Sequence, residues 1–164
     1  MAGDGGYSSY KKLFARQNLN YEEAVKELNK IFNELFGPAD DELEDIRERI
    51  TTFKSFKHFD WALKDIELME KKYPNEDTNG ERGYLYYDLK DDKNASKYLW
   101  QYFLDGKMHP SAYQFLAKSL ISNKEFDKAE KTIKKIEEQK STPYAQAIVN
   151  ELHLKLEKAR KESI

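Results

Sequence analysis

The amino-acid sequence predicts an all-α protein in which a helix-turn-helix repeat stacks into a solenoid. Between the prolines, apolar residues recur at spacings of three and four, as in amphipathic helices, and no stretch alternates with period two. The four prolines, at positions 38, 74, 110 and 143, are almost evenly spaced. Ala62, Ala95 and Ala129 recur with a period of about 34 residues, and a fixed period of this length indicates a repeat.

The second helix of each repeat is expected around its alanine. Near Ala129, the positions three before, four after and seven after hold Phe126, Ile133 and Ile136. These offsets place the side chains on one helical face. Ala62, Ala95 and Ala129 are each followed by a proline, at 74, 110 and 143. Each proline is expected to end the helix that contains the alanine.

The first helix of each repeat is expected to approach the second closely. Gly83 precedes Ala95 by the same interval at which Ala117 precedes Ala129, and a small side chain permits close helix packing. A glycine inside a helix costs about 1 kcal/mol relative to alanine. We therefore expect Gly83 to lie at a close contact between the two helices.

The segments 83–95 and 113–129 carry the small, aromatic and alanine positions in phase, and they resemble tetratricopeptide repeats. The resemblance covers about four-fifths of the chain, although Ile50 replaces a small residue and Asp92 an aromatic one. It implies three stacked helix pairs whose first helices line a concave groove. An ordinary helical bundle is the alternative. The predicted order is a flexible N-terminus at 1–8, a degenerate helical hairpin at 9–41, repeats at 42–75, 76–109 and 110–142, and a capping helix at 143–164.

Composition excludes several classes of site. The chain has no cysteine, so disulfides, thiolate zinc sites and cysteine nucleophiles are absent. Its formal net charge of −2 provides no field that would hold a nucleic acid. No apolar run approaches the ~20 residues of a membrane span. Residues 1–7 lack the basic start and the apolar stretch of a signal peptide, so we do not expect one there. We therefore expect a cytoplasmic protein without nucleic-acid partners.

The histidines do not form a metal or catalytic site in the sequence. His58, His109 and His153 are far apart along the chain, and none has a second histidine within one helical turn. His58 and His109 are expected at turns. The sequence therefore predicts a protein that is not an enzyme and that needs no metal or cofactor.

The repeat pattern predicts a partner-binding groove, in which Gln114 and Ser122 of the third repeat also lie. Its aromatic members are either exposed to a partner or packed in the core, and the sequence leaves both interpretations open. The nine predicted groove residues are Arg47, Thr51, Lys54, Tyr84, Tyr87, Asp88, Phe115, Lys118 and Ile121.

The leading functional hypothesis is a non-catalytic adaptor or chaperone that binds a protein or peptide segment in this groove. The layout is similar to that of small three-repeat secretion chaperones. The carboxylate clamp of some co-chaperones is not expected, because only Arg47 has suitable chemistry among the matching positions. One alternative is a structural or self-associating module that uses Tyr7, Tyr10, Leu13 and Phe14. Another is a regulatory subunit of an enzyme.

Overall fold

The computed structural model describes residues 3–139 and 142–164, except for the side chains of residues 3 to 5. Within these residues it contains nine α-helices and one short 3-10 turn, with no strand, which confirms the predicted all-α class. The chain divides into two compact units, unit 1 at Met1–Glu76 and unit 2 at Asp77–Ile164. None of the helices in the described ranges is long and apolar enough to cross a membrane.

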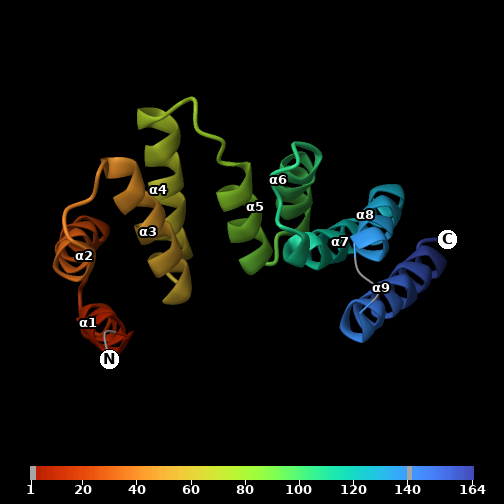
Figure 1. Ribbon diagram of the computed structural model, residues 1–164, viewed down its shortest axis with the longest axis horizontal. Coiled ribbons are helices and arrows are strands. Elements are labelled where there is room, and N and C mark those ends of the chain that lie inside the picture. The colour runs from red at the N-terminus through yellow and green to blue at the C-terminus, as the bar shows by residue number, and fades with distance from the viewer. Residues whose placement is uncertain (1–2, 140–141) are drawn as a thin grey trace. The chain divides into compact units, whose positions relative to one another are not determined.

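Unit 1 consists of four helices in which each packs on the next along the chain (Figure 1). Asp41 begins α3 by accepting a hydrogen bond from the backbone N–H of Glu44 at 3.0 Å, as expected for a carboxylate at a helix N-terminus. The helices are α1 (Gly3–Phe14), α2 (Tyr21–Phe36), α3 (Glu42–Ser55) and α4 (Phe59–Lys72).

Unit 2 continues this packing of neighbours, and its last helix contacts both α7 and α8 (Figure 1). A 3-10 turn at Pro110–Ala112 precedes α7. The helices are α5 (Asn79–Asp88), α6 (Asp92–Leu104), α7 (Tyr113–Ser122), α8 (Phe126–Gln139) and α9 (Pro143–Glu162). The pairs α3/α4, α5/α6 and α7/α8 therefore fall within the three predicted repeat ranges.

The three helix pairs share one turn geometry. The turns place Lys57, Lys90 and Lys124 in the left-handed region, with φ values of 64°, 60° and 59°. The residue after each lysine donates its backbone N–H to the carbonyl five positions earlier, at 2.8, 2.9 and 2.8 Å. This is the Schellman arrangement, in which glycine usually occupies the left-handed position. The period seen in the sequence is thus repeated in the backbone.

Gly83 lies at a close helix contact, as predicted, but its neighbour differs from the expected one. A Cβ atom at Gly83 would lie 2.5 Å from Cδ2 of Leu99 and 3.1 Å from its backbone nitrogen. Ala95 is fully buried one turn earlier in α6. At this point α6 contacts α5 through Leu99 and not through Ala95. The Leu99 side chain fits there because residue 83 has no side chain.

The N-terminal segment differs from the predicted flexible stretch at 1–8. Helix α1 begins at Gly3, while Met1 and Ala2 lie outside the described residues. The reason is tertiary packing: Gly6 is buried beside the Leu35 side chain, and the Tyr7 ring lies 6.1 Å from the Phe56 ring. These contacts order a segment that composition alone makes a weak helix former.

Candidate partner-binding site

Unit 2 contains an apolar cavity of about 560 Å³, which we call the α7–α9 cavity. It lies where the 3-10 turn and the start of α7 face the end of α8 and the start of α9. Residues 140 and 141, which connect α8 to α9, lie outside the described residues. The lining residues are His109, Pro110, Ser111, Tyr113, Gln114, Ile136, Gln139, Thr142, Tyr144, Ala145 and Ile148.

Two helix starts with similar local sequences position two walls of the cavity. In the first, Nδ1 of His109 accepts a hydrogen bond from the backbone N–H of Ser111 at 3.2 Å. In the second, Oγ1 of Thr142 accepts one from Ala145 at 3.1 Å. A proline follows each capping residue, as is common at the first helical position. Side-chain capping therefore fixes the backbone of the two segments that form these walls.

The described lining of the cavity is mostly apolar. Among the described residues that line it, none is Asp, Glu, Lys or Arg, although 35% of the chain is charged. Tyr113, Ile136 and Ile148 supply half-buried apolar surface. The Tyr113 ring is held in a T-shaped contact with Phe103, with centroids 5.2 Å apart. A concave apolar surface with a few polar groups is typical of ligand and peptide sites.

Amide side chains add hydrogen-bonding capacity at the cavity. Gln114 and Gln139 both line it, from α7 and from the end of α8. A primary amide donates and accepts hydrogen bonds, so it can pair with a peptide backbone. The arrangement can therefore hold apolar side chains and the polar main chain that carries them.

The predicted groove residues of α5 and α7 are partly brought together. The rings of Tyr87 and Phe115 are tilted against each other with centroids 5.2 Å apart, and both side chains are half-buried. Burial, with nearby Asp92 and Asp88, raises the pKa of Tyr87. Tyr84 packs against the Tyr102 ring at 6.3 Å instead of against Tyr87.

In unit 2, some predicted groove residues belong to the core and others are partly exposed. Ile121, with 7% of its surface exposed, belongs to the core and offers almost no area to a partner. Tyr84 and Phe115 pack against that core while remaining half-exposed. Lys118 is half-buried and Asp88 is exposed. Helical residues at i and i+3 share a face, so the side chain at 121 lies on the same side of α7 as the half-buried Lys118.

The other three predicted groove residues belong to α3 in unit 1. Arg47 is exposed and forms an ion pair with Glu76 at 2.9 Å. The Thr51 hydroxyl donates to the backbone carbonyl of Arg47 at 3.3 Å. Lys54 is half-buried.

Charged groups elsewhere form structural pairs. Buried Arg49 makes two hydrogen bonds with Asp65, at 2.8 and 3.0 Å, and a third with Asn29 at 2.9 Å. The Tyr21 hydroxyl donates to Asp65 at 2.6 Å, and burial together with this bond raises the pKa of Tyr21. These bonds join α2, α3 and α4 and leave the network satisfied, as a buried ion pair requires.

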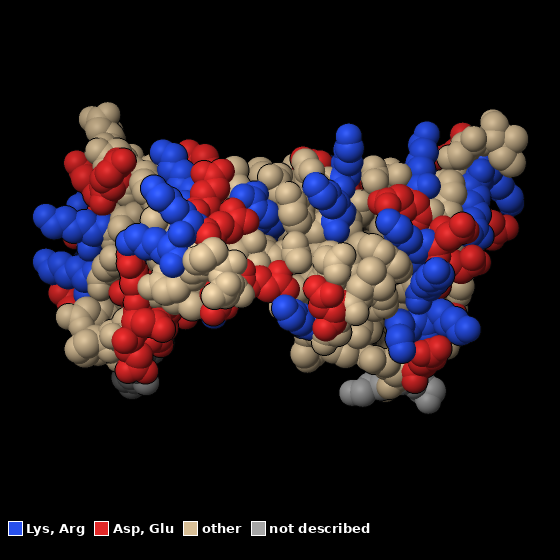
Figure 2. Space-filling model, turned by 90° about the horizontal axis from the view of Figure 1, so that it is seen from above, with Lys and Arg blue, Asp and Glu red and all other residues tan. Residues whose placement is uncertain are grey.

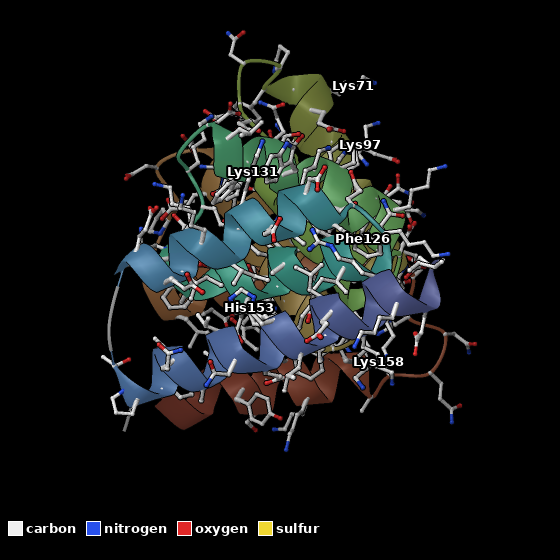
Figure 3. All side chains as sticks on the ribbon, turned by 90° about the vertical axis from the view of Figure 1, so that its right-hand side faces the viewer. Lys71, Lys97, Phe126, Lys131, His153 and Lys158 are labelled. Carbon is white, nitrogen blue, oxygen red and sulfur yellow. The ribbon has the colours of Figure 1, made fainter. Side chains whose placement is uncertain are left out.

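Among the residues that the structure describes, no group of three or more His, Asp or Glu side chains could hold a metal ion. His153 on α9 pairs with Glu137 on α8 through a 2.7 Å contact, and Figure 3 shows these two helices side by side.

The surface charges of both signs are mixed. Blue and red side chains are interspersed over both units in Figure 2, without a large field of one sign on that face.

The sequence predicts only part of this cavity. Gln114 was expected in the groove, whereas His109 was expected at a turn and Ile136 on the packing face of its helix, and neither was expected at a binding site. The sequence feature that could have indicated the cavity is the pair of His-Pro and Thr-Pro helix starts at 109–110 and 142–143, both of which line it. When the chain was compared with family models, curated proteins and solved structures, no match was found.

Proposed function

We propose that the protein is a non-catalytic protein-binding module that holds an uncharged, apolar segment of a protein partner in the α7–α9 cavity. The observation that carries the proposal is an apolar cavity of about 560 Å³ whose described lining has no charged side chain. Burying a charge without a partner is unfavourable, so this lining favours apolar groups over charged ones. Such binding suits an adaptor or a small chaperone.

The contacts support an extended segment. Apolar side chains of the segment enter between Tyr113, Ile136 and Ile148, while Gln114 and Gln139 pair with its backbone. The resemblance to tetratricopeptide repeats agrees with this, because α7 is the first helix of the third repeat range and first helices line the groove of such arrays. Phe115, also on α7, packs against Tyr87 outside the cavity lining.

A peptide-display experiment tests the proposal. The full-length protein is used to select binders from a random peptide library, and their affinities are measured by fluorescence anisotropy. We expect the selected peptides to be poor in Asp, Glu, Lys and Arg and rich in Leu, Phe, Tyr and Pro. The matched variants are Ala145→Glu, which places a charge in the cavity lining, and Ala147→Glu, which places it on exposed surface of the same helix.

The two variants separate the cavity from the rest of the surface. Ala145→Glu should weaken binding at least tenfold, whereas Ala147→Glu should leave it unchanged. The helical signal of both proteins should match that of the parent chain. Selection of charged peptides, absence of any enriched peptide, or equal binding by both variants would each refute the proposal.

A further inference from the structure

Helix α1 docks in an aromatic groove of unit 1, which we call the α1 groove: Phe32, Leu35, Phe53, Phe56 and His58. Leu13 is buried with 2% of its surface exposed. The Phe14 ring stacks on Phe56 with centroids 4.5 Å apart, and on His58 at 5.1 Å. One face of α1 thus supplies a continuous set of contacts to the α3–α4 turn.

The other end of that face extends the contacts to α2. The Tyr10 ring meets the Phe32 and Phe56 rings edge-on, at 6.2 and 6.4 Å. A Cβ atom at Gly6 would lie 3.0 Å from Cδ1 of Leu35. Aromatic pairs of this kind contribute about 0.5–1.5 kcal/mol each beyond the area they bury. Docking of α1 therefore depends on side chains, and not on the main-chain connection.

The helical propensity of α1 is low. Three of its first four residues are glycine, and each costs about 0.8–1.0 kcal/mol relative to alanine in a helix interior. A helix of 12 residues is marginal in water without packing partners. Helix α1 is thus stable only where a complementary groove is present, whichever copy of the chain supplies it.

The connection from α1 to α2 holds α1 weakly. Residues 15–18 and 20 are exposed, and Leu19 is half-buried. Asn18 adopts a left-handed backbone with φ 62°, a conformation that asparagine tolerates in turns. Six residues can span up to roughly 20 Å when extended. A connection this short allows little freedom within one chain, and short hinges of this kind invite exchange of the element that they tether.

Exposed apolar side chains border the α1 groove. Tyr7, Leu35 and Phe36 have 57%, 38% and 70% of their surface exposed, although terminal units of repeat proteins usually present a polar outer face. Leu35 is the residue that Gly6 contacts, so this patch is continuous with the groove. Contiguous exposed apolar surface marks an interaction site.

We propose that α1 exchanges between two copies of the chain, so that α1 of one copy docks in the α1 groove of the other. The occupant is a second copy because the residues at 7, 10, 13 and 14 already complement this groove, and exchange preserves every α1 contact. Exchange fills each groove with the same side chains and links the two copies through their connections at 15–20. Exchanging an identical element is a low-cost route to dimers.

Cross-linking of full-length chains tests the exchange, since the protein has no cysteine of its own. One chain carries Gly6→Cys and the other carries Leu35→Cys, positions in contact only when α1 occupies the groove. The chains are mixed at rising concentration, treated with a short bis-maleimide and separated under denaturing conditions. The control pair is Ser8→Cys with Leu35→Cys, because Ser8 is exposed on α1.

We expect a cross-linked heterodimer that increases with concentration and exceeds the control pair at least fivefold. A chain carrying both Gly6→Cys and Leu35→Cys should bridge internally at low concentration, which verifies the docking contact in the same variants. A heterodimer no stronger than the control overturns the proposal. So does equal cross-linking of Leu35→Cys chains to each other, which would indicate face-to-face association of the patches without exchange. Neither readout involves the α7–α9 cavity, so the test is independent of the proposed function.

Discussion

Unit 1 and unit 2 use different means to hold their helices together. In unit 1 the buried pair of Arg49 and Asp65, with Tyr21 and Asn29, joins three helices through directional hydrogen bonds. In unit 2 the α5–α6 contact depends on a missing side chain, because Leu99 fills the space above Gly83. The first device specifies alignment through charge and geometry, and the second through shape.

The two units are therefore expected to be destabilised by different kinds of substitution. A buried ion pair adds little net stability, but removal of one partner leaves an uncompensated charge in the interior. A close-packed glycine contact tolerates removal of atoms better than their addition. Each unit has one tryptophan, Trp61 in unit 1 and Trp100 in unit 2, so Trp→Phe backgrounds report the two units separately.

The largest expected effect is in unit 1. Asp65→Ala should lower the free energy of unfolding by about 3–5 kcal/mol, because it leaves the Arg49 guanidinium buried without its carboxylate. Urea denaturation followed by Trp61 fluorescence in a Trp100→Phe background measures this loss. Glu67→Ala, on the exposed face of the same helix, serves as the control and should change little. A loss below about 1 kcal/mol for Asp65→Ala would show that the pair does not hold unit 1 together.

The next effect is in unit 2. Gly83→Ala should destabilise the unit by about 1–3 kcal/mol through overpacking against Leu99. Gly80→Ala is the comparison, since its Cβ would meet only the far end of the Tyr102 ring, at 2.8 Å. That ring can swing away, so a gain in helix propensity of up to about 1 kcal/mol can offset the cost at Gly80, whereas at Gly83 the clash with Leu99 outweighs the same gain. Trp100 fluorescence in a Trp61→Phe background distinguishes the two, and equal effects would contradict the shape argument.

A smaller effect should be common to both units. Lys57→Gly and Lys90→Gly place glycine where the backbone is left-handed, and each should raise the free energy of unfolding by about 0.5–1 kcal/mol. Thermal denaturation of the two variants provides the measurement. Destabilisation by either one would mean that its turn does not keep the Schellman geometry in solution.

The smallest expected effect concerns pH and has opposite signs in the two units. Burial opposes ionisation of Glu125, but hydrogen bonds from Asn123, Ser96 and Lys128 outweigh it and lower its pKa. The stability from Glu125 is therefore present above its unfolded pKa and lost as pH falls through the folded value. Burial raises the pKa of Asp45, with Arg49 opposing, so its charge disfavours folding at neutral pH.

Two amide variants test these signs. At pH 7, Glu125→Gln should lose, and Asp45→Asn should gain, roughly a few tenths of a kcal/mol, because both groups are only partly buried and water screens their interactions. Both differences should shrink as the pH approaches 3. Urea denaturation at several pH values measures them, and the same sign in both variants would contradict the assignment.

Much of the helical layout could be predicted from the sequence. The period of Ala62, Ala95 and Ala129 placed three helix pairs within the observed ranges, and Pro143 marked the start of α9. The left-handed turns were not foreseen, since lysine carries no signal for positive φ. Helix α1 was missed at its start, because its order comes from contacts with α2 and the α3–α4 turn and not from its own glycine-rich sequence.

The candidate site was less predictable than the fold. The helical period identifies which residues share a face, but it cannot separate a half-exposed ring such as Phe115 from a core residue such as Ile121 on the same helix. The α7–α9 cavity arises from segments that are distant in sequence, at Tyr113 and at Ala145 and Ile148. Only tertiary packing brings them together.

The most direct test of the proposed function is chemical-shift mapping of the ¹⁵N-labelled full-length protein with a selected uncharged peptide. The largest changes should fall on the backbone of Tyr113, Gln114, Ala145 and Ile148 in unit 2, with little change in unit 1. Changes concentrated on α3, around Arg47 and Thr51, with none at the cavity would contradict the account.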